Sequence, residues 1–212
     1  MAGALHFQVM SGLRGLLTVL TTAALLCGDA RAVAPIVRDQ DIERALKLAQ
    51  ARDDTRAQFH APYIVNVNDA TLERVEVITE FRRYVLTTEE QLRMGRWLFA
   101  QGIKDAQGIL RPWRGRLSLV SRLRFHPHNT LLGLPPYELT IGDPDIVPVD
   151  VVRTPITALL SGKAHDWSAP LLGATIESVF DAVSVGDTVR PVRLSLDGKD
   201  VARVSIDFSK LE

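Results

Sequence analysis

The feature that most constrains the fold is a two-residue alternation of apolar and polar side chains that recurs along the chain. Within residues 113–125, Leu117 and Leu119 fall on one side, whereas Arg116 and Arg122 fall on the other. Successive side chains of a strand point to opposite faces, so this alternation predicts a strand with one buried face. Similar alternation occurs in residues 72–86, 174–183, 188–196 and 201–208.

Two helices are expected among these strands. Asp39 or Asp41 can cap the first helix, in which apolar residues recur at helical spacing. This helix can extend past residue 52, and Pro62 ends it. Thr88 begins a capping-box pattern, which predicts a second helix over residues 88–101.

Together these patterns predict a mainly β fold: an antiparallel β-sandwich-like domain with two short amphipathic helices near its N-terminal side. Asp197-Gly198 is a strong signal for a two-residue hairpin between the last two strands. We divide the chain into a leader (1–32), an extended lead with a helix (33–62) and a β-rich domain containing the inserted helix (63–212).

The N-terminus has the layout of a secretory signal peptide. The uncharged run of residues 15–27 follows Arg14, and Ala30 and Ala32 occupy the small-residue positions of a cleavage site. The run is shorter than the roughly 20 residues of a membrane-spanning helix. We therefore expect a periplasmic or secreted protein, soluble after cleavage near Ala32 and without a membrane span, with Met1 or Met10 as the start.

The only cysteine, Cys27, ends the apolar run. A lipid anchor there is the alternative to soluble export, but Leu26 stands where that signal requires a small residue. Cleavage after Ala32 removes Cys27, which excludes a disulfide, a catalytic thiol and a cysteine-bound metal from the mature chain.

Basic residues gather on the polar side of the predicted strand over residues 113–125. The chain as a whole is balanced, with 25 basic and 25 acidic residues, so an anion site has to come from a local cluster of this kind. Such a stripe can bind an anionic glycan through forked contacts. Alternatively, Glu76 and Glu80 of a neighbouring strand can neutralise the arginines in an Arg/Glu ladder. We prefer the ladder. The stripe consists of Arg114, Arg116, Arg122, Arg124 and His126.

A metal site is the second candidate. His126 and His128 form an H-x-H pair that presents two imidazoles to one side of a strand, and His165 and Asp166 are candidate further ligands. The adjacent arginines oppose a bound dication, and the spacing is not diagnostic of zinc. Asp143-Pro-Asp145 lacks the remaining ligands of a calcium loop.

Other catalytic signatures are missing from the sequence. No G-x-S-x-G turn, glycine-rich phosphate loop or dinucleotide fingerprint occurs. Trp167 lies in a loop beside His165 and Asp166, where it can stack on a sugar or plug the end of a sandwich.

The sequence therefore favours an exported, non-enzymatic protein with a binding, scaffolding or assembly role. One alternative is a small metal-assisted hydrolase that uses His126, His128, His165 and Asp166. The other is a binder of an anionic glycan or similar ligand. No cofactor is expected, and the expected partner is an anionic ligand or another envelope protein. Nucleic acid is disfavoured because the stripe has no interleaved aromatic residues.

Overall fold

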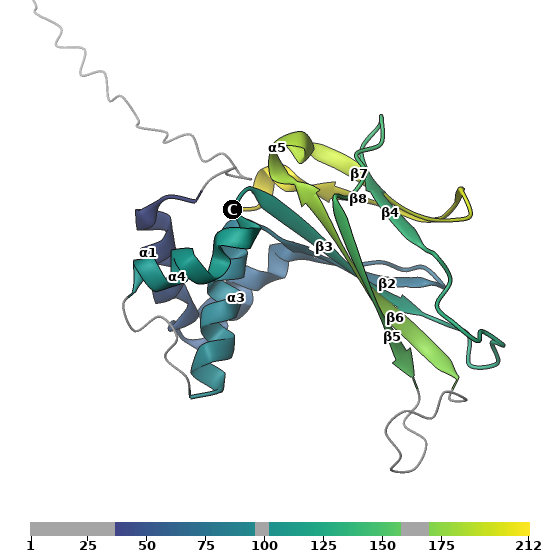
Figure 1. Ribbon diagram of the computed structural model, residues 1–212, viewed down its shortest axis with the longest axis horizontal. Coiled ribbons are helices and arrows are strands. Elements are labelled where there is room, and N and C mark those ends of the chain that lie inside the picture. Colours follow the sequence, from purple (N-terminus) through teal and green to yellow (C-terminus); the bar gives the residue numbers. More distant parts are fainter. Residues whose placement is uncertain (1–36, 96–101, 158–169) are drawn as a thin grey trace, which may run out of the picture.

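The computed structural model describes residues 37–95, 102–157 and 170–212. Two antiparallel sheets, of five and three strands, are combined with helices that lie mostly in the first half of the chain (Figure 1). Helix accounts for 34% of the structure and strand for 38%, so the fold is mixed α/β rather than mainly β. The predicted antiparallel pairing is confirmed.

The larger sheet has the strand order β1-β2-β3-β6-β5. Its central strand, β3, pairs with β2 on one side and β6 on the other, while the short β1 and the proline-containing β5 form the edges. The bounds are β1 (Ile64–Asn66), β2 (Leu72–Ile78), β3 (Arg116–Arg124), β5 (Asp150–Thr157) and β6 (Leu171–Asp181).

The smaller sheet has the order β4-β7-β8, with bounds β4 (Glu138–Ile141), β7 (Val189–Leu196) and β8 (Lys199–Asp207). The predicted hairpin between β7 and β8 is confirmed, since Leu196 pairs with Lys199 across the turn. Asp197 and Gly198 have φ values of 51° and 73°, the two positive angles that this tight turn requires.

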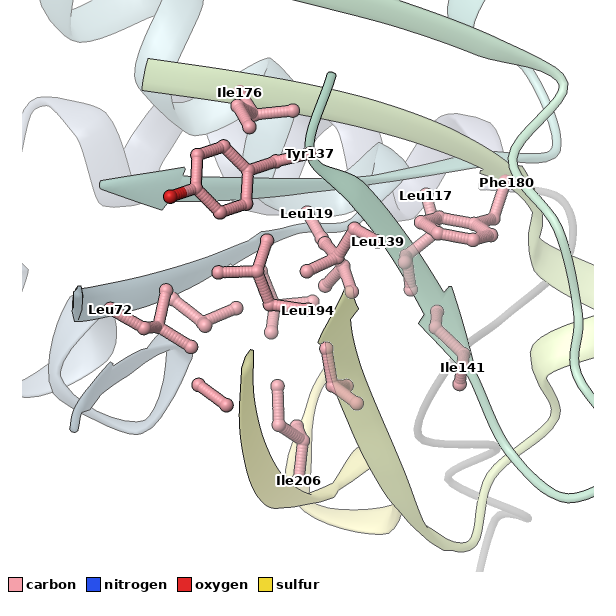
Figure 2. Packing of buried hydrophobic residues seen from close by; sticks show 14 of the residues in the cluster. Leu72, Leu117, Leu119, Tyr137, Leu139, Ile141, Ile176, Phe180, Leu194 and Ile206 are labelled. Carbon is pink, nitrogen blue, oxygen red and sulfur yellow. The ribbon is translucent and has the colours of Figure 1, made fainter. Parts of the chain in front are cut away.

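The main hydrophobic core lies between the two sheets. Leu119 of β3 and Ile176 of β6 come from the larger sheet, and Leu139 of β4, Leu194 of β7 and Ile206 of β8 come from the smaller one (Figure 2). Each is almost completely buried, and burying such a side chain contributes about 1.5–3 kcal/mol. The alternation in the sequence therefore identifies the inner face of the strands correctly.

Helices α1, α3 and α4 form a second layer at one end of the larger sheet (Figure 1). Ala45 of α1, Val85 of α3 and Ala106 of α4 belong to a small core of their own, separate from the core between the sheets. The bounds are α1 (Asp39–Ala49), α2 (Asp53–His60), α3 (Glu80–Arg93), α4 (Ile103–Leu110) and α5 (Ala182–Val185), with 3₁₀ turns η1 (Ala61–Tyr63), η2 (Arg111–Trp113) and η3 (Phe208–Lys210).

The strand predicted over residues 72–86 is wrong in its second half. β2 ends at Ile78, and α3 begins at Glu80. The hydroxyl of Thr79 accepts a hydrogen bond from the backbone N–H of Arg82 and so caps the helix. Thr88, the predicted start, lies inside α3 and donates its hydroxyl to the carbonyl oxygen of Tyr84.

Two other boundaries differ from prediction. The first predicted helix is divided, since α1 ends at Ala49 and α2 begins at Asp53. The long strand begins only at Arg116, because Trp113 belongs to the 3₁₀ turn η2. No helix in the described ranges is long and apolar enough to cross a bilayer, and the proposed leader (1–32) lies outside them.

Gly173 and Gly108 offer a matched test of this packing. A Cβ at Gly173 in β6 would lie 2.1 Å from the carbonyl oxygen of Leu123, whereas a Cβ at Gly108 in α4 meets nothing within 4 Å. We expect Gly173→Ala to lower the free energy of unfolding by about 1–3 kcal/mol, because backbone must move to make room. Gly108→Ala should raise it by about 0.5–1 kcal/mol. Urea denaturation measures both, and equal effects would contradict the close approach of β6 to β3.

Candidate functional site

The structure divides the predicted basic stripe. Arg116, Arg122 and Arg124 lie on β3 with their side chains on the outer face, away from the smaller sheet. Arg114 lies before the strand, so it is not part of the stripe. Arg116 pairs in register with Asp181 of β6 and is separated from the other two arginines along the strand.

The ladder expected to neutralise the stripe does not form. Glu76 lies on β2, but its carboxylate accepts a 2.5 Å hydrogen bond from Arg82 of α3. Glu80 is the first residue of α3, and its carboxylate accepts from the backbone N–H of Gly115 at 2.8 Å. Both glutamates are therefore committed to contacts of the helical layer.

Arginine instead faces arginine across β2 and β3. Arg74 is the register partner of Arg122, and Arg124 lies two residues further along the same face. Within the described ranges, the one carboxylate within 4 Å of these three guanidiniums is that of Glu73, 3.3 Å from Arg122. Like charges directly opposite each other in a sheet are destabilising. We call Arg74, Arg122 and Arg124 the arginine face.

The two histidines follow the end of β3 in an exposed turn. The ring centroids of His126 and His128 are 5.5 Å apart, and Nδ1 of His126 accepts a hydrogen bond from the backbone N–H of His128. This bond leaves Nε2 of His126 as its available ligand atom.

In the portion of the chain that the structure describes, no group of three or more His, Cys, Asp or Glu side chains could hold a metal ion. His165, Asp166 and Trp167 lie outside the described residues. The metal-assisted hydrolase therefore remains a sequence-based prediction.

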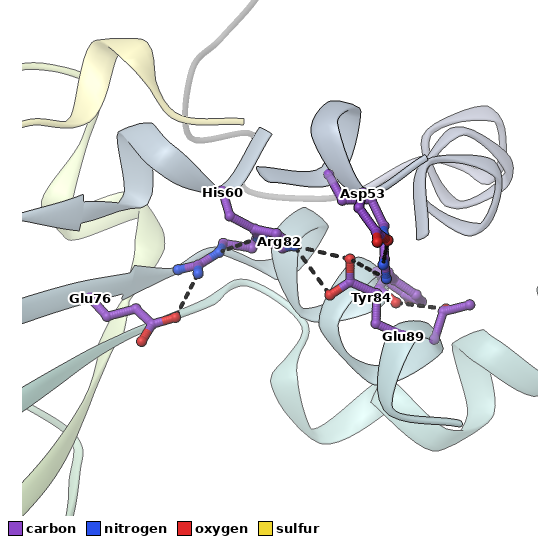
Figure 3. Close-up of polar contacts among 8 residues, drawn as sticks. Asp53, His60, Glu76, Arg82, Tyr84 and Glu89 are labelled. Atoms are coloured by element: carbon purple, nitrogen blue, oxygen red, sulfur yellow. Dashed lines mark hydrogen bonds and ion pairs between the residues drawn. The ribbon is translucent and has the colours of Figure 1, made fainter. Parts of the chain in front are cut away.

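A buried polar network that the alternation does not reveal joins α3 to β2 and α2 (Figure 3). The guanidinium of Arg82 is almost fully buried and donates to the carboxylate of Glu76, to the carbonyl oxygen of Val77 and, at 3.3 Å, to Nδ1 of His60. Nε2 of His60 consequently carries the hydrogen and donates to Glu89, 3.1 Å from each carboxylate oxygen. Burial lowers the pKa of Arg82, and Glu76 opposes that shift.

The next arginine of α3 anchors the helix to the other side of β3. Arg83 contacts the hydroxyl of Ser118 at 2.6 Å and the carboxylate of Glu177 on β6 at 3.1 Å. Its guanidinium lies 3.6 Å from the ring centroid of Trp113, a cation–π contact. Burial lowers the pKa of Arg83, with Glu177 acting in the opposite direction.

A cleft of about 640 Å³ opens where α1, α3 and α4 meet the segment before β3. Arg114 lies here, together with Glu80 and Tyr84, which the sequence did not single out as a site. Burial raises the pKa of Glu80, against the effect of hydrogen bonds from the backbone N–H groups of Gly115 and Val37. Burial, with the nearby Glu80 carboxylate, raises the pKa of Tyr84 to about 12.

A comparison of the chain with protein families, with curated proteins and with solved structures found no match in any of the three. We therefore infer function from the geometry of two candidate sites, the arginine face and the cleft. They lie on different parts of the molecule, since one is a sheet surface and the other is formed mainly by helices.

The buried and exposed ion pairs of β2 should differ in their contribution to stability. We expect Glu76→Ala to lower the free energy of unfolding by about 2–3 kcal/mol, because it leaves the buried guanidinium of Arg82 without its carboxylate. Glu73→Ala removes only the half-exposed pair with Arg122 and should cost less than about 1 kcal/mol. Urea denaturation of the two variants makes the comparison, and similar losses would refute the structural role of Arg82.

Glu80 should make stability depend on pH. Because its pKa is raised from 4.5 in the folded state, the native protein keeps this proton after the unfolded chain has released it. Stability due to Glu80 is therefore present at low pH and is lost as pH rises from 4.5 through the folded pKa. Replacement by Gln should abolish this loss, as measured by unfolding at several pH values, whereas Glu138→Gln on β4 serves as the exposed control. An unchanged pH profile in Glu80→Gln would contradict the assignment.

Proposed function

We propose that the protein is an exported, non-enzymatic binding protein that holds an acidic polysaccharide on the arginine face. The observation that carries the proposal is the pairing of Arg74 with Arg122, with Arg124 beside them and one exposed carboxylate nearby. An anionic ligand would relieve the repulsion among these cations and accept their forked hydrogen bonds.

The outer face also offers uncharged hydrogen-bonding groups in line with the arginines. Across the sheet, the register continues from Arg74 and Arg122 to Thr175 of β6 and Thr154 of β5. Neighbouring strands are about 4.8 Å apart, so this row covers roughly 14 Å. A sugar chain that carries carboxylate or sulfate groups alongside hydroxyl groups matches such a row of cations and threonine hydroxyls.

A polysaccharide suits this surface better than nucleic acid does. No aromatic residue is among the exposed large hydrophobic side chains of the described ranges, and single-stranded nucleic acid is usually held by stacking on aromatic rings. Binding suits it better than catalysis does, because an open sheet face does not exclude water from a bound ligand.

The proposal places the protein outside the cytoplasm and treats its two sheets as a sandwich-like scaffold. Export rests on the apolar run of residues 15–27 and the small residues before position 33. The sandwich rests on the common core that the two sheets share. In this arrangement the smaller sheet stabilises the inner face of the larger one and leaves its outer face available to the polysaccharide.

Retention on heparin, a sulfated polysaccharide, tests the proposal. We expect the purified protein to bind and to elute with increasing salt, and Arg122→Ala/Arg124→Ala to lower the affinity by about tenfold or more, since bonds to charged groups contribute about 1.5–3 kcal/mol each. The matched control is Arg52→Ala/Arg203→Ala. It also removes two exposed positive charges, one at the residue before α2 and one on β8.

Three results would overturn the proposal. One is an absence of heparin binding, and another is an equal loss of affinity in the two double variants, which would indicate a response to total charge alone. The third is tighter binding to single-stranded DNA than to heparin at the same salt concentration.

A further inference from the structure

The cleft at the helical end of the molecule has walls contributed by four segments. They are the start of α1, the first two turns of α3, the second half of α4 and the residues leading into β3. Val37, Ile42 and Leu110 supply apolar surface, and all three are buried. Its volume of about 640 Å³ falls within the range of small-molecule sites, about 300–1,000 Å³.

Three arginines line this cleft, and one of them, Arg114, lies close enough to Glu80 for its charge to oppose the rise in the pKa of that carboxyl. Arg38, Arg111 and Arg114 are exposed, and no ion pair within 4 Å joins any of them to a carboxylate of the described ranges. The two acidic residues of the lining are already engaged. Glu80 accepts from the backbone N–H of Gly115, and Asp39 accepts from the amide of Gln107 at 2.6 Å. The cleft therefore presents more cationic groups than its own carboxylates neutralise.

A buried hydroxyl also faces the cleft. The side chain of Tyr84 is 4% exposed and packs in the helical core, and Tyr84 lines the cleft. Among the described residues its hydroxyl has no hydrogen-bond partner, and the charges that act on it, those of Glu80, Arg114 and Asp39, all belong to residues that line the cleft. Its oxygen therefore lies among the residues of the cleft, where it is placed to donate a hydrogen bond to a ligand. Burial and Glu80 keep this hydroxyl protonated by raising its pKa to about 12.

We propose that this cleft binds a small oxyanion, a carboxylate or a phosphate, through the guanidiniums of Arg111 and Arg114 and the hydroxyl of Tyr84. Arginine offers a planar fork that matches either group, and the neutral hydroxyl adds a donor at the depth of the cleft. The partly buried walls screen these contacts less than bulk water does. This site is independent of the polysaccharide proposed for the arginine face.

Calorimetric titration of the purified protein with inorganic phosphate and, separately, with citrate tests the site. We expect saturable binding of at least one of them, and Arg111→Gln and Tyr84→Phe should each weaken it by about tenfold or more. We expect both variants to keep the fold, because Arg111 is exposed and forms no ion pair with another described residue, and the phenyl ring of Phe retains the packing of Tyr84. The relative affinities of phosphate and citrate identify which oxyanion the cleft prefers.

Matched controls separate the cleft from other basic surfaces. Arg203→Gln on β8 and Tyr137→Phe in the core between the sheets should leave the affinity unchanged, as should Arg122→Ala/Arg124→Ala on the arginine face. The proposal is overturned if neither anion binds saturably, or if Arg111→Gln and Tyr84→Phe bind as the unchanged protein does. It is also overturned if the arginine-face variant loses the binding instead. Thermal unfolding of each variant confirms that it is folded before the titration.

Discussion

The structure depends on how the buried guanidinium of Arg82 is satisfied. A buried charge without partners is strongly unfavourable, so each element that supplies a partner has its position fixed. Those partners are Glu76 and the Val77 carbonyl from β2, His60 from the end of α2, and the ring of Tyr63, 4.8 Å from the guanidinium. Arg82 therefore holds α3 against β2 and ties both to the segment that connects α2 with β1.

Helix α3 also determines which carboxylates of the larger sheet are available to pair with the arginines on its outer face. Arg82 engages Glu76 of β2, and the adjacent Arg83 engages Glu177 of β6, on either side of β3. These carboxylates are the acidic groups in register with Val120, at the middle of the outer face. Because the helix engages both, the exposed Glu73 is the one carboxylate paired with Arg122 in the part of the chain that the structure describes. The cationic character of the outer face is thus a consequence of helix packing.

Local patterns predicted the elements that depend on local chemistry. The Asp197-Gly198 hairpin and the buried side of β3 are confirmed. The first helix begins at Asp39, but its N-cap residue is Arg38 rather than an aspartate, and Asp41 accepts a hydrogen bond from the backbone N–H of Arg38. The junction of β2 and α3 was missed because Val77, Phe81 and Val85 are four residues apart. That spacing fits the even period of a strand and nearly fits a helical turn. The helix cap is Thr79, whereas the capping-box pattern predicts a helix that starts nine residues later, at Thr88.

The candidate sites could be predicted only in part, because alternation assigns a residue to a face without saying what covers that face. Glu177 and Arg83 are 94 positions apart, and no spacing in the chain relates them. The alternation predicts Arg114 in the same stripe as Arg122, but Gly115 between Arg114 and β3 has a φ of 66°. In this left-handed conformation, which glycine adopts readily, the backbone departs from the strand, and Arg114 lies at the cleft. One glycine therefore divides a single basic run into two surfaces that face different surroundings.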